Sequence, residues 1–400
     1  MAIVSPPNHL VPHAALTRCL RELANYVVLR NEEDLFGNFQ RGGDIDLLVG
    51  DLELAERTLI HHLGPPVRLI RSSYVRGYSY DWGHIDLLPT NEWRGACYLP
   101  TEAVLEGRRV SPQGRPVPKI DHEAVISWFS SLLWGGFFKE RYAAEIRQAV
   151  EIDASAFRQT LMGVAGKKWG LRLWQAAVDG HAEISAEWTR SLRRAVWWRA
   201  FLSSPVRTIQ RSVAFVIGEL RLRFQPSVPW VAILGPDGSE KSALANELVD
   251  RFAACPYGNV KVIHWRSRLT APSWRLLAAA NWLGSYWARW ARLRAKGYIL
   301  TIDRTDLDVI GEHTRHKNGA SPRLGRALWW LLPKPDLVFV LDSNADIVSV
   351  DEIQRVIRAW MSNQSVAALG VPAPIVAAPT LNAVGSSGAP TSMSRGDRAR

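Results

Sequence analysis

The chain has few cysteines and no long apolar run. Its three cysteines, Cys19, Cys97 and Cys255, are far apart and odd in number, so we expect neither a disulfide framework nor a cysteine metal site. No run of about 18 apolar residues occurs, so we expect no membrane span. The opening segment, MAIVSPPNHL, has no basic region followed by an apolar run, so we expect no signal peptide. Together these absences predict a cytoplasmic protein.

Acidic residues are outnumbered by basic ones. The formal net charge is +11, and the chain carries 18 tryptophans. This combination is compatible with a nucleic-acid partner or an anionic membrane surface. A globular protein that binds phosphorylated substrates explains it as well, and we favour that interpretation, so nucleic acid is not expected as a partner. The ten histidines include no i, i+4 metal pair with a glutamate, and no Ser-His-Asp grouping is evident.

A length of 400 residues predicts two or three domains. Within residues 1–115, short apolar runs predict strands at Tyr26–Arg30, Ile45–Val49 and His84–Leu88. A helix is expected at Leu52–Leu63. The pattern indicates an N-terminal α/β domain.

Residues 116–228 read as helical throughout. The predicted helices are His122–Trp134, Lys139–Val150, Ala156–Met162, Trp169–Val178, Ser191–Leu202 and Ser212–Phe224. Near residue 200, three aromatic residues, Trp197, Trp198 and Phe201, fall among Arg193, Arg194, Arg199 and Arg207. We expect these tryptophans to pack into a core while the arginines face solvent; a helix lying on a membrane surface is the alternative.

Strand and helix patterns alternate again over residues 229–362, which predicts a doubly wound parallel sheet. The expected strands are Trp230–Leu234, Val260–His264, Tyr298–Ile302 and Leu337–Leu341. The expected helices are Lys241–Ala253, Ser273–Lys296 and Leu324–Leu332. Residues 363–400 are rich in Ala, Pro, Ser, Gly and Thr and are expected to form a disordered tail.

The segment from Gly235 to Ser242, GPDGSEKS, follows an apolar strand and precedes a helix. This is the context that a phosphate-binding loop requires, because backbone N–H groups and the helix N-terminus then face the phosphates. Gly235, Gly238 and Ser239 are the expected cradle. Lys241 would reach the β- and γ-phosphates of ATP, and Ser242 would hold Mg²⁺.

One position departs from this motif, because Glu240 stands where glycine normally precedes the lysine. A side chain in a left-handed conformation there would cost ~1–2 kcal/mol. A carboxylate ~4 Å from a phosphate charge would cost ~4 kcal/mol at an effective dielectric of 20. Nucleotide binding is therefore expected to depend on where Glu240 points.

Acid and arginine follow a second strand of this domain. Tyr298–Ile302 leads into Asp303 and Arg304. The segments GPDGSEKSAL, GYILTIDRTDLD and PKPDLVFVLD together resemble the thymidylate kinase-like family over residues 229–361. The resemblance implies that Asp303 lies near the metal or substrate and that Arg304, with Arg315, contacts phosphate. The family's arginine-bearing lid is shortened here.

Two further acids, Asp44 and Asp46, share one face of a strand, and Asp86 lies in another strand. Three such carboxylates can bind divalent metal ions for attack on a nucleotide phosphate; acids at a solvent-facing sheet edge are the alternative. Residues 20–110 resemble the nucleotidyltransferase superfamily, in which these three acids would be the metal ligands. The family's Gly-Ser step is expected near Arg30-Asn31, which is not Gly-Ser; Gly37-Asn38 is an alternative that lies close to Asp44.

The whole layout resembles a bacterial arrangement in which a nucleotidyltransferase-like domain precedes a helical segment and a thymidylate kinase-like domain. That resemblance implies a Mg²⁺-dependent, ATP-using transferase acting on a nucleotide or phosphorylated small molecule, in surface-polysaccharide biosynthesis. A degenerate, non-catalytic nucleotide sensor or scaffold is the main alternative. A peripheral binder using the tryptophan-rich helices is another. A homodimer is left open.

Overall fold

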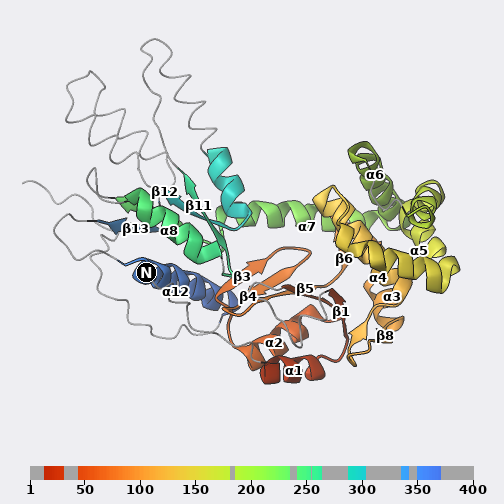
Figure 1. The fold of residues 1–400 in the computed structure, drawn as a ribbon, viewed down its shortest axis with the longest axis horizontal. Helices are drawn as coiled ribbons and strands as arrows, with labels where there is room; N and C mark the ends of the chain where they lie inside the picture. The colour runs from red at the N-terminus through yellow and green to blue at the C-terminus, as the bar shows by residue number, and fades with distance from the viewer. Residues whose placement is uncertain are drawn as a thin grey trace, which may run out of the picture.

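A computed structural model describes eight stretches of the chain, drawn as coloured ribbon in Figure 1. They are residues 13–30, 44–180, 185–234, 241–253, 255–263, 287–302, 335–341 and 349–370. The predicted helix at Leu324–Leu332 and residues 371–400 of the predicted tail lie outside them. The described part is a mixed α/β structure that contains a parallel sheet.

Five strands form the N-terminal sheet in the order β1-β2-β5-β4-β3. They are β1 (Tyr26–Arg30), β2 (Asp44–Val49), β3 (Arg68–Arg71), β4 (Arg76–Ser79) and β5 (His84–Leu88). Only β2 and β5 run parallel; the other neighbours are antiparallel. All three strands predicted in this region are present, and β3 and β4 add a hairpin beside them.

Alternate residues of this sheet enter two different cores. On β1, Tyr26 and Val28 pack with helices α1 (His13–Glu22) and α2 (Leu52–Leu63). Val27 and Leu29 pack on the opposite face, with the central helices. This period of two is what a strand buried on both faces requires. Helix α2 matches its predicted bounds and is capped by Asp51, whose carboxylate accepts from two backbone N–H groups.

Two small hairpins and a short helix follow the sheet. They are β6 (Asn91–Trp93) with β7 (Ala96–Leu99), α3 (Thr101–Glu106), and β8 (Arg109–Val110) with β9 (Pro116–Val117). The turn of the first hairpin places Arg94 at φ 51° and Gly95 at φ 89°. A Cβ on Gly95 would lie 2.3 Å from the backbone nitrogen of Ser212, so glycine is needed where a central helix packs on the turn.

The central segment is helical, as predicted, with different divisions. It contains α4 (Ile120–Ser130), a π-helical turn (Ser131–Gly135), a 3₁₀ turn (Glu140–Tyr142), α5 (Ala143–Val178), α6 (Ala186–Ser203) and α7 (Pro205–Phe224). The three helices predicted between residues 139 and 178 form one element, α5, interrupted by non-helical backbone at Asp153 and Gly166. Asp153 caps the second part, because its carboxylate accepts from the N–H of Ala156.

The tryptophans of this segment only partly follow the expectation. Trp197 is partly buried, but Trp198 is 55% exposed, so the predicted core packing is wrong for Trp198. Helix α7 buries Thr208 and Gly218 against the rest of the protein and leaves most of its large apolar side chains exposed. Figure 1 shows α7 running between the lobe with β10–β13 and the lobe with α4–α6.

The C-terminal sheet is parallel throughout, in the order β11-β12-β10-β13. Its strands are β10 (Trp230–Leu234), β11 (Asn259–Ile263), β12 (Tyr298–Ile302) and β13 (Leu337–Val340), with helix α8 (Lys241–Ala253) after β10 and α12 (Val350–Leu369) after β13. The described end of the predicted helix Ser273–Lys296 is helical over residues 287–295. Apolar side chains from β10, α8 and α12 form one core.

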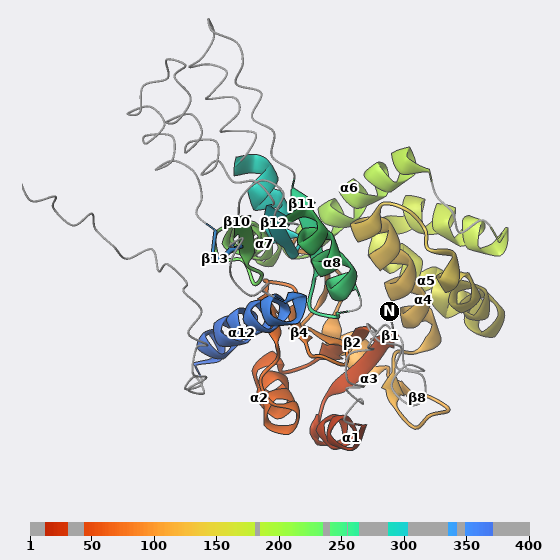
Figure 2. The same ribbon diagram turned by 60° about the vertical axis from the view of Figure 1, so that its left-hand side comes forward.

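Helix α12 ties the C-terminal lobe to the N-terminal sheet, and Figure 2 shows it beside β4 and α2. The Ser365 hydroxyl donates to the carbonyl of Val67, and Arg71 donates to the carbonyl of Ala368. Residues 363–369 therefore belong to this helix, whereas the sequence analysis assigned them to the tail. Buried Val366 explains the difference, because the helix gains packing that composition does not reveal.

Candidate functional site

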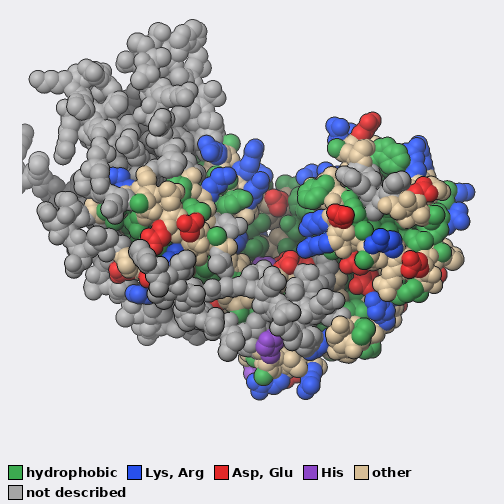
Figure 3. Space-filling view, viewed as in Figure 1, with side chains coloured by type: hydrophobic (Ala, Val, Ile, Leu, Met, Phe, Trp, Pro, Cys, Tyr) green, Lys and Arg blue, Asp and Glu red, His purple; other side chains and the backbone are tan. Residues whose placement is uncertain are grey.

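Two of the predicted acids meet on the N-terminal sheet. The parallel pairing of β2 with β5 places Asp46 directly opposite Asp86. Because residues two apart share a face, Asp44 and His84 point to the same side of the sheet, in the next row. Asp46 is 3% exposed and Asp86 is partly exposed. Figure 3 shows acidic and histidine side chains in the hollow between the two lobes.

A histidine and a serine organise Asp86. The Asp86 carboxylate lies 2.9 Å from Nε2 of His84, and the other ring nitrogen of His84 lies 2.8 Å from the Ser79 hydroxyl. Across the antiparallel pairing, Gly77 stands opposite Asp86. A Cβ at Gly77 would lie 2.8 Å from the Asp86 oxygen. The missing side chain thus leaves room for the Asp86–His84 pair.

The third acid lies apart from the pair. Asp44 is exposed and faces His84 in the neighbouring row. Among the described residues, no three His, Cys, Asp or Glu side chains lie close enough together to hold a metal ion. The described donors therefore fit a metal centre only in part, with two adjacent carboxylates where the predicted site has three.

An arginine at the edge of the same sheet reaches into the C-terminal lobe. Arg68 on β3 is paired with Ser79 and so shares the face of the acids. Its guanidinium donates to the Ser227 hydroxyl at 2.9 Å and to the Tyr257 carbonyl at 3.0 Å. Burial lowers the pKa of Arg68 to about 10, and the charge of Asp86 opposes that change. Arg68 stays charged at neutral pH and links the acid row to the other lobe.

Aromatic side chains border this face. Tyr74, in the β3–β4 turn, stacks on Trp134 with ring centroids 4.7 Å apart and also contacts Phe215 of α7. Burial raises the pKa of Tyr74 to about 12, and the charges of Glu219 and Asp86 add to the effect. The tyrosine therefore remains a neutral hydroxyl near the acids throughout the physiological pH range.

The described residues on either side of the segment GPDGSEKS belong to the C-terminal sheet and to the helix that follows its strand β10. Strand β10 lies between β12 and β13, and all three run parallel. The chain leaves β10 after Leu234, and α8 begins at Lys241, which is 8% exposed. Lys241 and Ser242 thus stand in the first turn of α8, where the N-terminal N–H groups and the helix dipole attract anions.

Several predicted site residues lie outside the described part of the chain. They are Gly235, Gly238, Ser239, Asp303, Arg304 and Arg315, together with Glu240. In the sequence, Asp303 directly follows the last residue of β12, Ile302, and β12 is the neighbour of β10. Because the carboxyl ends of parallel strands meet at one edge, ligands of α/β sheets bind there.

Sequence reasoning missed the residues that support Asp86. His84 is two positions before Asp86, so the period of a strand could have placed both on one face. Ser79, Gly77 and Arg68 come from other strands, and only the pairing register brings them to the acids.

No protein-family model matches this chain, and a comparison with curated proteins finds none that is similar. No helix in the part of the chain that the structure describes has both the length and the apolar content needed to cross a membrane.

Proposed function

We propose that this chain is a Mg²⁺-dependent, nucleotide-binding transferase, similar to thymidylate kinases, that moves a phosphoryl group from ATP to a nucleotide or a related acceptor. The observation that carries the proposal is that α8, which begins at Lys241, is the next described element after β10, an interior strand of a parallel sheet. That placement is the one in which a glycine-rich loop holds phosphates.

The described donors fit ATP and Mg²⁺ at this end of the sheet. Lys241 would neutralise charge on the β- and γ-phosphates, and the Ser242 hydroxyl would be the ligand to Mg²⁺. When bound, the metal would neutralise charge that develops on the transferring group. Asp303 and Arg304 would act at the end of β12, on the metal and on an acceptor phosphate, as the family resemblance implies. A role in surface-polysaccharide biosynthesis is part of the same proposal and rests on that resemblance alone.

Calorimetric titration with Mg·ATP up to millimolar concentration tests the proposal. Replacing Lys241 with alanine removes a charge-assisted hydrogen bond, so we expect a loss of affinity of about tenfold to a hundredfold. Lys261→Ala is the matched control, because Lys261 is an exposed lysine of the same domain whose ammonium lies over the Tyr298 ring. Absence of ATP binding by the unmodified chain would reject the kinase-like function.

The second candidate function is a non-catalytic nucleotide sensor or scaffold. Glu240 favours it, because a carboxylate at this motif position would repel a bound phosphate. Under this alternative, we expect Glu240→Gly to bind nucleotide at least tenfold more tightly than the parent chain does. Equal affinities of parent and variant would argue against it. Phosphoryl transfer by the parent, followed as ADP formation with nucleotide acceptors, would exclude it.

The acid row of the N-terminal sheet supports a weaker assignment. Nucleotidyl transfer would require carboxylates that hold a divalent metal ion, and the carboxylate residues Asp46 and Asp86 are adjacent. We propose that this row is the remnant or the core of a nucleotidyltransferase-like site. Its activity would be separate from ATP binding at Lys241, so Asp46→Asn is expected to leave that binding unchanged.

A further inference from the structure

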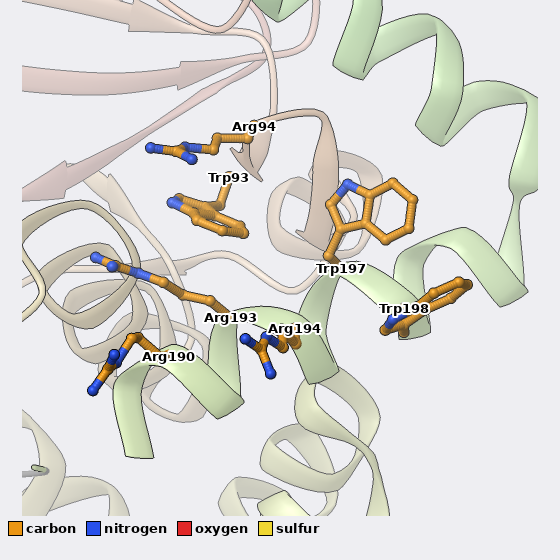
Figure 4. Close-up of a pocket in the computed structure, with 7 residues that line it drawn as sticks. All are labelled: Trp93, Arg94, Arg190, Arg193, Arg194, Trp197 and Trp198. Atoms are coloured by element: carbon orange, nitrogen blue, oxygen red, sulfur yellow. The ribbon is translucent and has the colours of Figure 1, made fainter. Parts of the chain in front are cut away.

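A hollow of about 430 Å³ lies between the β6–β7 hairpin and α6. Four arginines line it, namely Arg94 from the hairpin turn and Arg190, Arg193 and Arg194 from α6. The remaining lining residues are the tryptophans Trp93, Trp197 and Trp198. Among the described residues, no acidic side chain lines it. Figure 4 shows Trp93 between the side chains of Arg94 and Arg193.

The centre of this pocket is held in place. The guanidinium carbons of Arg94 and Arg193 lie 5.2 and 5.7 Å from the centre of the Trp93 ring, within the range of cation–π contacts. Arg193 also donates to the carbonyls of Leu132 and Leu133, at 3.1 and 3.0 Å. The pocket therefore has one arginine, Arg193, that two backbone carbonyls hold in place beside the Trp93 ring.

The charge arrangement calls for an anion. Burial lowers the pKa of Arg193, and the positive charge of Arg94 lowers it further. In the described part of the chain, none of the four arginines forms an ion pair with an acidic side chain. Gathering like charges without a counter-charge is unfavourable, and guanidinium groups pair bidentately with phosphate oxygens.

We propose that this pocket binds a phosphate group that belongs to a larger ligand. Arg190, Arg193 and Arg194, which lie on the α6 side of the Trp93 ring, would hold the phosphate. The exposed Trp198 would contact the apolar part of the ligand next to it. The pocket is built from β6–β7 and α6, whereas the proposed ATP site is at the start of α8. It is therefore a second anion site, independent of the proposed function.

Two sources can supply such a phosphate, a soluble phosphorylated molecule or a lipid headgroup. Exposed apolar residues on α6 and α7 favour the lipid. Leu202 at the end of α6 is 75% exposed, and on α7 Val206 is 67% and Phe224 73% exposed. Between Val206 and Phe224, further exposed apolar residues of α7 recur every three or four positions. They form one stripe along the helix, with arginines on either side of it. An apolar stripe on the helix that follows α6 and packs against it suits a phospholipid surface.

The experiment uses the full chain and two probes. Inorganic pyrophosphate is titrated while tryptophan fluorescence is followed, and vesicles of phosphatidylcholine with or without phosphatidic acid are used for co-sedimentation. The double variant Arg190→Ala/Arg194→Ala is compared with Arg147→Ala/Arg158→Ala, which removes the same charge from exposed positions of α5. Lys241→Ala removes any contribution from the ATP site.

We expect the control to bind at least one probe as the parent does, and the pocket variant to bind it at least tenfold more weakly. Any pyrophosphate binding that Lys241→Ala removes is assigned to the ATP site and is subtracted from all chains. Weakened binding of pyrophosphate alone identifies a soluble ligand, and weakened binding of phosphatidic acid vesicles alone identifies a lipid. Unchanged binding in the pocket variant, or no binding of either probe by the parent, overturns the proposal. Equal melting temperatures of the two double variants exclude misfolding as the cause.

Discussion

The two sheets of this protein carry their polar groups in different places. In the N-terminal sheet, the acids lie within the strands, and Asp46 and Asp86 face each other across β2 and β5. In the C-terminal sheet, the described part of β10 is apolar, and Lys241 and Ser242 begin the helix that follows it. One sheet carries its polar groups on a face, and the other carries them beyond an edge.

The difference follows from how each sheet is covered. A sheet with all strands parallel is packed on both faces, so its polar groups are placed beyond the carboxyl ends of the strands. The mixed N-terminal sheet is packed by α1 and α2 on one face, and its other face holds both a core and the acid row. Polar groups there cost free energy unless they are hydrogen bonded, which explains the Ser79–His84–Asp86 chain.

The largest effect is expected where the C-terminal sheet begins. Arg294 donates to Asp336 at 2.6 Å, and the same Asp336 oxygen accepts from the N–H of Trp230 at the start of β10. The Arg294 side chain is only 5% exposed. Arg294→Ala removes a buried guanidinium together with its hydrogen bonds to Asp336 and to the Val228 carbonyl, so we expect a loss of ~3–5 kcal/mol in the free energy of unfolding.

Urea unfolding measures this loss. Arg292→Ala is the control, because Arg292 is an exposed arginine in the same helical turn. A loss of similar size in both variants would show that the ion pair does not anchor β10.

A buried carboxyl beside the acid row should make stability depend on pH. Burial raises the pKa of Glu92 from 4.5 to about 7, and Arg211 partly offsets this. Between these values the folded chain binds more protons than the unfolded chain, so the free energy of unfolding falls as pH rises from 4.5 to 7 and stays level above 7. At ~1.4 kcal/mol per pKa unit, the penalty at pH 8 is on the order of 3 kcal/mol.

Glu92→Gln should remove that part of the pH dependence and make the protein more stable at pH 8 than the parent. Thermal unfolding of the two chains at pH 5 and pH 8 measures it. Parallel pH profiles for parent and variant would contradict the predicted ionisation.

A smaller effect is expected from the glycine opposite Asp86. Gly77→Ala places a Cβ 2.8 Å from the Asp86 oxygen and 3.0 Å from the His84 ring, so the pair must move, at a cost of about 1–2 kcal/mol. Gly163→Ala is the control, since nothing lies within 4 Å of its Cβ; replacing this helix glycine should stabilise by ~0.5–1 kcal/mol. Destabilisation of equal size in both variants would mean that Asp86 needs no such space.

Features that depend on neighbouring residues could be predicted from the sequence, and features that depend on distant contacts could not. The apolar strands could be predicted because burial on both faces of a sheet requires apolar side chains throughout. The helix α2 could be predicted from the helical spacing of its apolar residues. The segment GPDGSEKS is contiguous in the sequence, so Lys241 and Ser242 could be placed at the start of a helix without knowledge of the sheet order. The contacts of Arg68 with Ser227 and Tyr257 could not, since they join residues 159 and 189 positions apart. The merging of the helices in α5 and the exposure of α7 depend on tertiary packing in the same way.

Calorimetric titration of Mg·ATP into the parent chain, Lys241→Ala and Asp46→Asn tests most directly that the nucleotide binds at the edge of the C-terminal sheet. Asparagine has nearly the same shape as aspartate, so the acid row keeps its packing. The account predicts that Lys241→Ala weakens binding at least tenfold while Asp46→Asn binds as the parent does. Loss of binding in Asp46→Asn with full binding in Lys241→Ala would contradict it and move the nucleotide site to the face of the N-terminal sheet.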